Sequence, residues 1–159
     1  MSTGGRYLVQ FDPHTKNHFI KSITKRYSSR QWQATRKSLE FVLEHIDQHI
    51  LTDKARTIHA SDVGRIVKLY FKIAGTKDSA RGSGNRAIVF LDDTLHTARV
   101  LLVYSKKEIC QPNETVKWQK MISEQFPEIM KKAPRLLNCR SYLLDSIANI
   151  EDKIKSRPL

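Results

Sequence analysis

A run of alternating residues in the middle of the chain restricts the fold more than any other feature. From Arg65 to Ala74, apolar residues take every second position, and Lys68, Tyr70 and Lys72 lie between them. A β-strand points successive side chains to opposite faces of its sheet. The segment therefore predicts a strand with one face on the core and with both lysines and the tyrosine together on the other face.

Periodicity elsewhere predicts further strands after this one and two helices before it. The second helix has Ser28 and Gln31 at the spacing of a capping box. We expect loops at Leu51–Val63, which is polar and aperiodic, and at Thr76–Asn85, which is rich in glycine. The expected strands are Arg6–Phe11, Arg65–Ala74, Arg86–Asp92 and Ala98–Ser105, and the expected helices are His18–Arg26 and a longer one with apolar residues from Trp32 to Ile50.

The C-terminal part of the chain predicts helices. One helix is expected to begin with Asn113 as its cap and to end at Pro127. Beyond it, apolar residues from Leu136 to Ile154 recur at spacings of three, four and seven, which is typical of an amphipathic helix. We therefore expect an α+β domain over residues 1–129, with two N-terminal helices packed on a small antiparallel sheet, and a helical extension over residues 130–159.

The charge of the chain indicates an anionic partner. The net charge is +12, and half of it falls in residues 64–107, which hold nine basic and three acidic side chains. A field of this sign attracts polyanions. The longest apolar stretch, Val100–Tyr104, is too short to span a membrane, and the first residues do not resemble a secretion signal, so we expect a cytoplasmic protein. The histidine pairs His14/His18 and His45/His49 have no third ligand at a suitable spacing, which argues against a metal site.

Three motifs, in this order, resemble the RelE/ParE superfamily of type II toxins. The resemblance covers about Arg6 to Ile129 and is closest to the RelE and HigB branches. The motifs are Lys68-Leu69-Tyr70-Phe71-Lys72, the turn and strand Gly82-Ser83-Gly84-Asn85-Arg86-Ala87-Ile88-Val89-Phe90-Leu91, and Leu101-Leu102-Val103-Tyr104-Ser105-Lys106-Lys107.

The resemblance implies a RelE-like fold and an mRNA interferase, an endoribonuclease that cuts mRNA without a metal or other cofactor. In several members of the superfamily, cleavage takes place only on mRNA in the ribosomal A site. The expected partners are therefore mRNA and the ribosome, together with a cognate acidic antitoxin. A homo-oligomer formed through the C-terminal helix is a further expectation.

Matching position by position, the resemblance implies a catalytic set of basic residues. Lys68 and Lys72 match the strand lysines of the superfamily, Arg86 matches the turn arginine, and Lys106 or Lys107 matches the basic residue after the last strand. RNA cleavage without a metal needs a base for the 2′-OH, cations for the phosphorane and an acid for the 5′-oxygen. A lysine acts as a base when neighbouring cations lower its pKa, whereas arginine stays protonated and suits phosphate binding.

Two features depart from the superfamily pattern. RelE has an arginine after the last strand and a tyrosine further on that stacks on the substrate base, and this chain has lysines at the first position and no tyrosine near Asn113. Tyr70 and Tyr104 could replace that tyrosine, although Tyr104 could equally belong to the core. In the long loop, Lys77 and Arg81 are candidates for RNA binding or for a solvated tip.

Two other functions remain open from the sequence. A ParE-like inhibitor has the same fold but binds DNA gyrase, and it generally lacks the lysine cluster found here. A non-catalytic RNA-binding homologue of the toxin fold gains support from the missing tyrosine.

Overall fold

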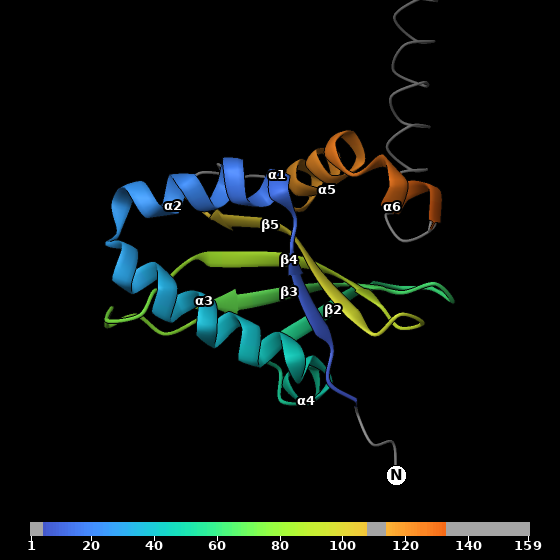
Figure 1. Cartoon of the computed structure of the whole chain (residues 1–159), viewed down its shortest axis with the longest axis horizontal. Coiled ribbons are helices and arrows are strands. Elements are labelled where there is room, and N and C mark those ends of the chain that lie inside the picture. The colour runs from blue at the N-terminus through green and yellow to red at the C-terminus, as the bar shows by residue number, and fades with distance from the viewer. Residues whose placement is uncertain (1–4, 108–113, 133–159) are drawn as a thin grey trace, which may run out of the picture.

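The computed structural model describes residues 5–107 and 114–132, which form an α+β fold around a five-stranded sheet (Figure 1). The helices lie in two groups, one between the first and second strands and one after the last strand. The strands are β1 (Leu8–Phe11), β2 (Ala55–Ala60), β3 (Arg65–Phe71), β4 (Asn85–Asp92) and β5 (Thr97–Ser105). The helices are α1 (Pro13–Thr15), the π-helical segment η1 (Lys16–Ile20), α2 (Lys21–Arg26), α3 (Ser29–Glu44), α4 (Ile46–Leu51), α5 (Glu114–Gln125) and α6 (Pro127–Lys132).

The strands lie in the order β1-β5-β4-β3-β2. β1 pairs with β5 in parallel, and every other neighbouring pair is antiparallel. The predicted meander of three antiparallel strands is confirmed as β3, β4 and β5. The predicted antiparallel sheet is therefore wrong in one pair, and the sheet is mixed. The first group of helices carries the chain from β1 at one edge to β2 at the other, and the meander then returns β5 beside β1 in the parallel direction.

The loop predicted at Leu51–Val63 is wrong, because this segment contains the edge strand β2. Its pairing with β3 shifts register between Thr57 and His59, and its burial does not alternate regularly. A bulge of this kind interrupts the period of two on which the sequence prediction depends. Pairing with β3, rather than a local pattern, makes the segment a strand.

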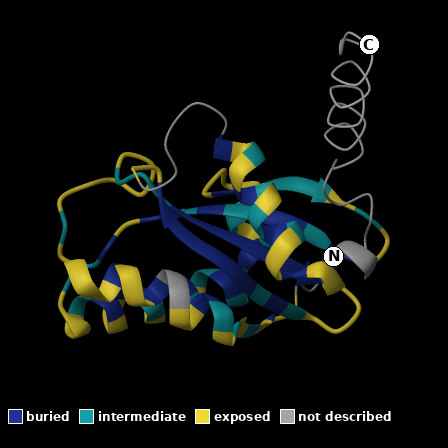
Figure 2. Cartoon of the chain, turned by 90° about the horizontal axis from the view of Figure 1, so that it is seen from above, coloured by how far each residue is buried: buried dark blue, intermediate teal, exposed yellow. Residues whose placement is uncertain are grey.

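The strands of the sheet are largely buried (Figure 2). Two apolar cores lie on opposite faces of the sheet. The first core packs α3 against Val67 and Leu69 of β3, which confirms the predicted alternation as far as Phe71, where the strand ends. The second core packs α5 against Ile66 of the same strand and Ile88 of β4. The sheet is therefore buried by helices on both faces, and polar residues of β3 approach α5.

The N-terminal helices differ from the prediction at their ends. The first group begins at Pro13, where Pro is favoured in a first helical turn and where the side chain of Asp12 accepts a hydrogen bond from the backbone of His14. The long helix predicted to reach Ile50 breaks at His45, whose φ of −117° is not helical. The chain therefore turns between α3 and α4 within an apolar pattern that continues across the break.

The capping box predicted at the start of α3 is confirmed. The Ser28 hydroxyl accepts from the Gln31 backbone at 3.2 Å, and the Gln31 side chain accepts from the Ser28 backbone at 3.1 Å. The Gln31 amide also donates to the Ala74 carbonyl at 3.3 Å. The cap therefore fixes the start of α3 and its position relative to the chain that follows β3.

We expect Ser28→Ala to lower the free energy of unfolding by about 1 kcal/mol, because an N-cap hydroxyl typically contributes that much. Urea unfolding followed by circular dichroism measures the change. Ser29→Ala is the matched control, since Ser29 is exposed and is the first residue within the helix. Equal losses in the two variants would contradict a specific capping role.

A network of polar side chains links Tyr7, just before β1, and Arg65 of β3 to the turn between β4 and β5. The Arg65 guanidinium binds Asp93 at 2.8 Å and Asp47 at 2.9 Å, and it donates to the Tyr7 hydroxyl at 2.8 Å. The Tyr7 ring stacks on His96 with a centroid distance of 4.5 Å. Burial opposes ionisation of Asp93, but hydrogen bonds from Arg65 and Tyr7 outweigh it and lower the pKa of Asp93.

The C-terminal helices bring the chain back over the second core. Trp118 and Ile122 of α5 are fully buried there. Pro127, which was predicted to end a helix, follows the end of α5 and begins α6. Asn113 and the apolar stripe from Leu136 to Ile154 lie outside the described residues. Within the part of the chain that the structure describes, no helix is both long and apolar enough to cross a membrane.

Candidate functional site

The structure brings several of the predicted residues together on the sheet face that α5 partly covers. Tyr70 of β3 lies opposite Arg86 of β4, and Arg86 lies opposite Tyr104 of β5. Lys68 is two residues before Tyr70 on the same strand and therefore shares its face. Lys106 follows the end of β5, and its backbone is held there by a 2.9 Å hydrogen bond to Gly84.

Three of these groups converge on the carboxylate of Glu114, the first residue of α5. Oε1 of Glu114 accepts from the Tyr104 hydroxyl at 2.7 Å and lies 3.0 Å from Nζ of Lys68. Oε2 lies 4.0 Å from Nζ of Lys106. The Lys68 and Glu114 side chains are only 14% and 8% exposed, whereas that of Lys106 is 44% exposed. Among the described members of the cluster, Lys106 is therefore the one most open to solvent.

Electrostatics in the cluster hold Glu114 ionised. Burial opposes the charge, but hydrogen bonds from Tyr104 and Lys68 and the charges of Lys68 and Lys106 outweigh it and lower the pKa of Glu114. Burial, followed by the bond to Glu114, raises the pKa of Tyr104. Glu114 is therefore a carboxylate at neutral pH, and the tyrosine hydroxyl donates to it. Tyr104 is 2% exposed, so its ring is not open to a substrate base.

Arg86 is placed at the cluster but is covered. It is 3% exposed, and its guanidinium donates to the backbone carbonyls of Asn85 at 2.9 Å and Arg81 at 3.3 Å. Its Nε has no hydrogen-bond partner among the described residues. In this conformation Arg86 fastens the end of the long loop, and phosphate binding would require the loop to uncover it.

Tyr70 and Arg81 form a stack at the edge of this face. The Arg86 guanidinium lies 4.4 Å from the centroid of the Tyr70 ring, and the Arg81 guanidinium lies 5.0 Å from it. Such cation–π contacts hold the ring between the strand and the loop. Arg81 also pairs with Asp53 at 2.7 Å, which links the loop to the chain before β2.

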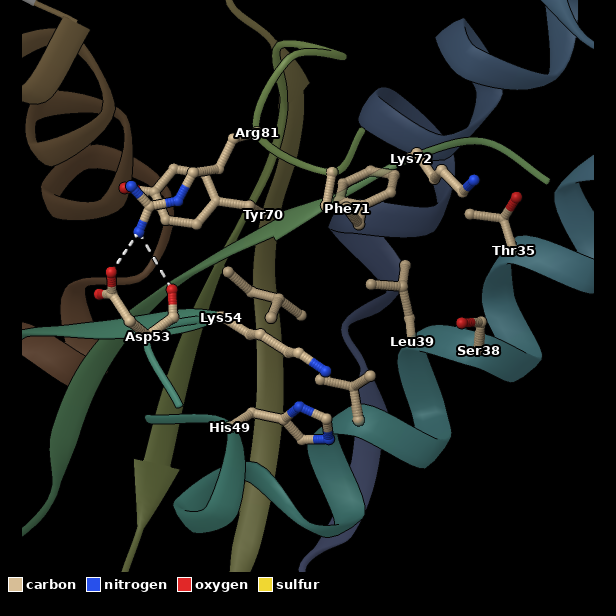
Figure 3. A pocket seen from close by; sticks show the side chains of 13 residues that line it. Thr35, Ser38, Leu39, His49, Asp53, Lys54, Tyr70, Phe71, Lys72 and Arg81 are labelled. Carbon is tan, nitrogen blue, oxygen red and sulfur yellow. Dashed lines mark hydrogen bonds and ion pairs between the residues drawn. The ribbon is translucent and has the colours of Figure 1, made fainter. Parts of the chain in front are cut away.

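The remaining predicted residues do not meet in the cluster. Lys72 follows the end of β3 and lines a pocket beside α3, together with Leu39 and Phe71 (Figure 3). Lys77 is exposed in the long loop. Lys107 is also exposed, and its backbone donates to the Ser105 hydroxyl at 3.3 Å. The structure thus keeps Lys68 and Lys106 as central cations, whereas Lys72 lies beyond the end of β3, next to Thr35 of α3 (Figure 3). The prediction that Lys72 belongs to the strand and shares the face of Lys68 is therefore wrong, because β3 ends at Phe71.

Glu114 is the member of the cluster that sequence reasoning missed. Its only local signal is its place at the start of a predicted helix, where acidic residues are common for reasons of helix stability. Two of its contacts come from different strands. Lys68 of β3 lies more than forty residues before it in the sequence, and Tyr104 of β5 lies ten residues before it. Distant pairing of this kind leaves no pattern in the sequence.

The arrangement combines a carboxylate, two ammonium groups and a phenol within a partly covered site. A carboxylate can take a proton, and ammonium groups can stabilise phosphate charge and return a proton. In residues 5–107 and 114–132, no group of three or more His, Cys, Asp or Glu side chains is arranged to hold a metal ion. No protein-family model matches the chain, and no similar curated protein or solved structure is found. A function for the chain is therefore inferred from the chemistry of these residues.

Proposed function

We propose that this chain is an endoribonuclease of the RelE/HigB-like toxins, which cleaves mRNA by using the 2′-OH of the RNA as nucleophile. The observation that carries the proposal is the convergence of Lys68, Tyr104 and Lys106 on Glu114. A base, phosphate-binding cations and a proton donor are the groups that this reaction requires. The basic character of the surrounding chain favours an RNA substrate.

In the proposed reaction Glu114 is the general base. Its carboxylate takes the proton from the 2′-OH, the 2′-oxygen attacks phosphorus, and the bond from phosphorus to the 5′-oxygen breaks. Lys106, the more exposed of the two lysines, gives a proton to the leaving 5′-oxygen and regains one from solvent. The products are a 2′,3′-cyclic phosphate and a 5′-OH, and Glu114 returns its proton to water.

Lys68 serves this reaction as a cation rather than as the base expected from the sequence. A lysine becomes a base when like charges crowd it, but Nζ of Lys68 lies 3.0 Å from a carboxylate oxygen. Lys68 therefore stabilises negative charge on the phosphorane, and Tyr104 orients Glu114.

The resemblance to RelE and HigB supplies the biological setting of the proposal. It implies mRNA on the ribosome as substrate and an acidic antitoxin as the partner that neutralises the toxin. The mixed α+β fold and the confirmed meander are compatible with a RelE-like arrangement. A ParE-like gyrase inhibitor would not need the cluster around Glu114.

A second candidate, a non-catalytic RNA-binding homologue, is favoured by the burial of Arg86. This residue matches a phosphate-binding arginine in the resemblance, yet it is 3% exposed and bound to two carbonyls. Lys68 is likewise paired already with Glu114. A protein of this class would bind RNA with a strong dependence on salt and leave it intact.

The test is to map the RNA ends produced by the purified chain from free RNA and from mRNA on ribosomes. We expect 5′-OH and 2′,3′-cyclic phosphate ends, and we expect Lys68→Gln to slow cleavage about 100-fold, since it removes one transition-state cation. Lys25→Gln, at an exposed lysine of α2, controls for the change in net charge. Binding without cleavage would favour the second candidate, and 5′-phosphate ends would contradict the mechanism.

A further inference from the structure

A pocket of about 350 Å³ opens beside α3 at the end of β3 (Figure 3). Its lining joins residues of the first core to Tyr70 and Arg81 at the edge of the candidate site. Leu39, Leu69 and Phe71 form much of its apolar lining, together with Val42. β2 pairs with β3 only as far as the partners Ala55 and Leu69. The edge strand therefore leaves the end of β3 uncovered, and the pocket lies there.

The rim of the pocket is cationic. Lys54, Lys72 and Arg81 lie on it, opposed by a single carboxylate, Asp53. Figure 3 shows the side chains of Lys54 and His49 close to each other among the residues that line the pocket. Burial, followed by neighbouring positive charges, lowers the pKa of His49, so this histidine is neutral at pH 7. The pocket thus combines an apolar floor with a net positive rim.

An ion pair on the rim, between Arg81 and Asp53, is exposed to solvent. Arg81 and Asp53 are joined at 2.7 Å, but their side chains are 60% and 80% exposed. Exposed pairs of this kind contribute little to stability, because water and salt screen them. A carboxylate from another molecule could therefore replace Asp53 at Arg81 without loss of the fold.

We propose that this pocket binds an extended acidic segment of a partner protein, with one aliphatic side chain on the apolar floor and carboxylates at Lys54, Lys72 and Arg81. Charge complementarity with a chain of net charge +12 favours such a partner. The inference does not depend on ribonuclease activity, because peptide binding is measured without RNA. Tyr70 and Arg81, which line the pocket, also stand at the edge of the candidate site.

One polar group of the pocket, the Thr35 hydroxyl, is already occupied, which favours an aliphatic group over a nucleobase beside it. A nucleobase buried on this floor would need partners for its ring nitrogens and carbonyl oxygens. The hydroxyl of Thr35, which lines the pocket, already donates to the Gln31 carbonyl at 2.8 Å and accepts from the Ala74 backbone at 2.8 Å. An aliphatic side chain makes no such demand.

The probe is a fluorescein-labelled nonapeptide in which a single leucine is flanked by glutamates, and its control has serine in place of leucine. Fluorescence anisotropy with the full chain measures both affinities. We expect the serine peptide to bind about tenfold more weakly, because it buries no aliphatic group.

Protein variants test the cationic rim. The double variant Lys54→Glu, Lys72→Glu should weaken binding of the leucine peptide by tenfold or more. The double variant Lys25→Glu, Lys37→Glu makes the same change of charge at exposed lysines outside the pocket and should weaken it much less.

Val42→Asp tests the floor, because it places a carboxylate where the leucine would pack, and thermal unfolding shows whether this variant is folded. If Val42→Asp does not fold, the two double charge variants still test the proposal. Equal binding of the leucine and serine peptides would overturn the proposal, as would equal losses in the two double variants or no binding at millimolar peptide. Oligouridylate is the RNA probe. If it binds the wild type, and if Lys54→Glu, Lys72→Glu weakens this binding while Lys25→Glu, Lys37→Glu does not, the pocket is assigned to RNA instead.

Discussion

Glu114→Gln is expected to slow RNA cleavage by about 100-fold or more while the protein remains folded. Glutamine has nearly the same shape and its amide oxygen can still accept from Tyr104, but it cannot take a proton from a 2′-OH. General base catalysis contributes on the order of 100-fold to 10,000-fold in rate. Single-turnover cleavage of an end-labelled RNA, measured with the enzyme in excess, separates this effect from weaker binding.

The dependence on pH is a second measurement on the same residue. Because the pKa of Glu114 is lowered, the carboxylate stays ionised to a lower pH than an ordinary glutamate, whose pKa is about 4.3. The acid limb of the rate profile should therefore lie below about pH 4.3. A lowered pKa in the folded state also means that ionised Glu114 stabilises the fold above the unfolded-state pKa and that this stability is lost as the pH falls through the folded-state value. Glu114→Gln should remove both dependences.

Glu124→Gln is the matched control, because Glu124 lies on the same helix with a 59% exposed side chain and pairs only loosely with Lys120 at 3.8 Å. It should leave the rate of cleavage unchanged. A Glu114→Gln protein that cleaves as fast as wild type would show that Glu114 is not the base. Faster cleavage would mean that Glu114 competes with the RNA phosphate for Lys68 and Lys106.

Trp118→Ala is expected to lower the free energy of unfolding by about 3 to 5 kcal/mol, the usual cost of deleting a fully buried aromatic side chain. Trp118 is 0% exposed and packs α5 onto the second core. Because α5 begins at Glu114, loss of this anchor should also disorganise the site. Urea unfolding measures the stability, and RNA cleavage by the folded fraction measures the effect on the site.

A second substitution at the same position separates volume from polarity. The indole Nε1 of Trp118 is buried and has no hydrogen-bond partner among the described residues. Trp118→Phe keeps most of the apolar volume and removes this N–H, so it should cost clearly less than Trp118→Ala. Lys120→Ala, at a 74% exposed position of the same helix, should change stability by no more than about 0.5 kcal/mol. A loss below about 1 kcal/mol for Trp118→Ala would show that α5 does not anchor the fold.

Local patterns in the sequence were enough to predict most of the strands and helices. The alternation around Lys68 predicted β3 and its buried face, and Ser28 with Gln31 predicted the start of α3. These features depend on residues a few positions apart, and local geometry decides them. The break at His45 escaped prediction because the apolar pattern runs across it, although the backbone there is not helical.

The sequence by itself determined that β3 presents Lys68 and Tyr70 on one face, because a period of two follows from strand geometry alone. Only the tertiary structure decided what those side chains meet. The packing of α5 set Glu114 against Lys68, and the long loop covered Arg86 with backbone carbonyls. The edge strand β2 likewise exists through its pairing with β3. Contacts between distant segments depend on how whole helices and strands pack, and a local sequence pattern does not predict that packing.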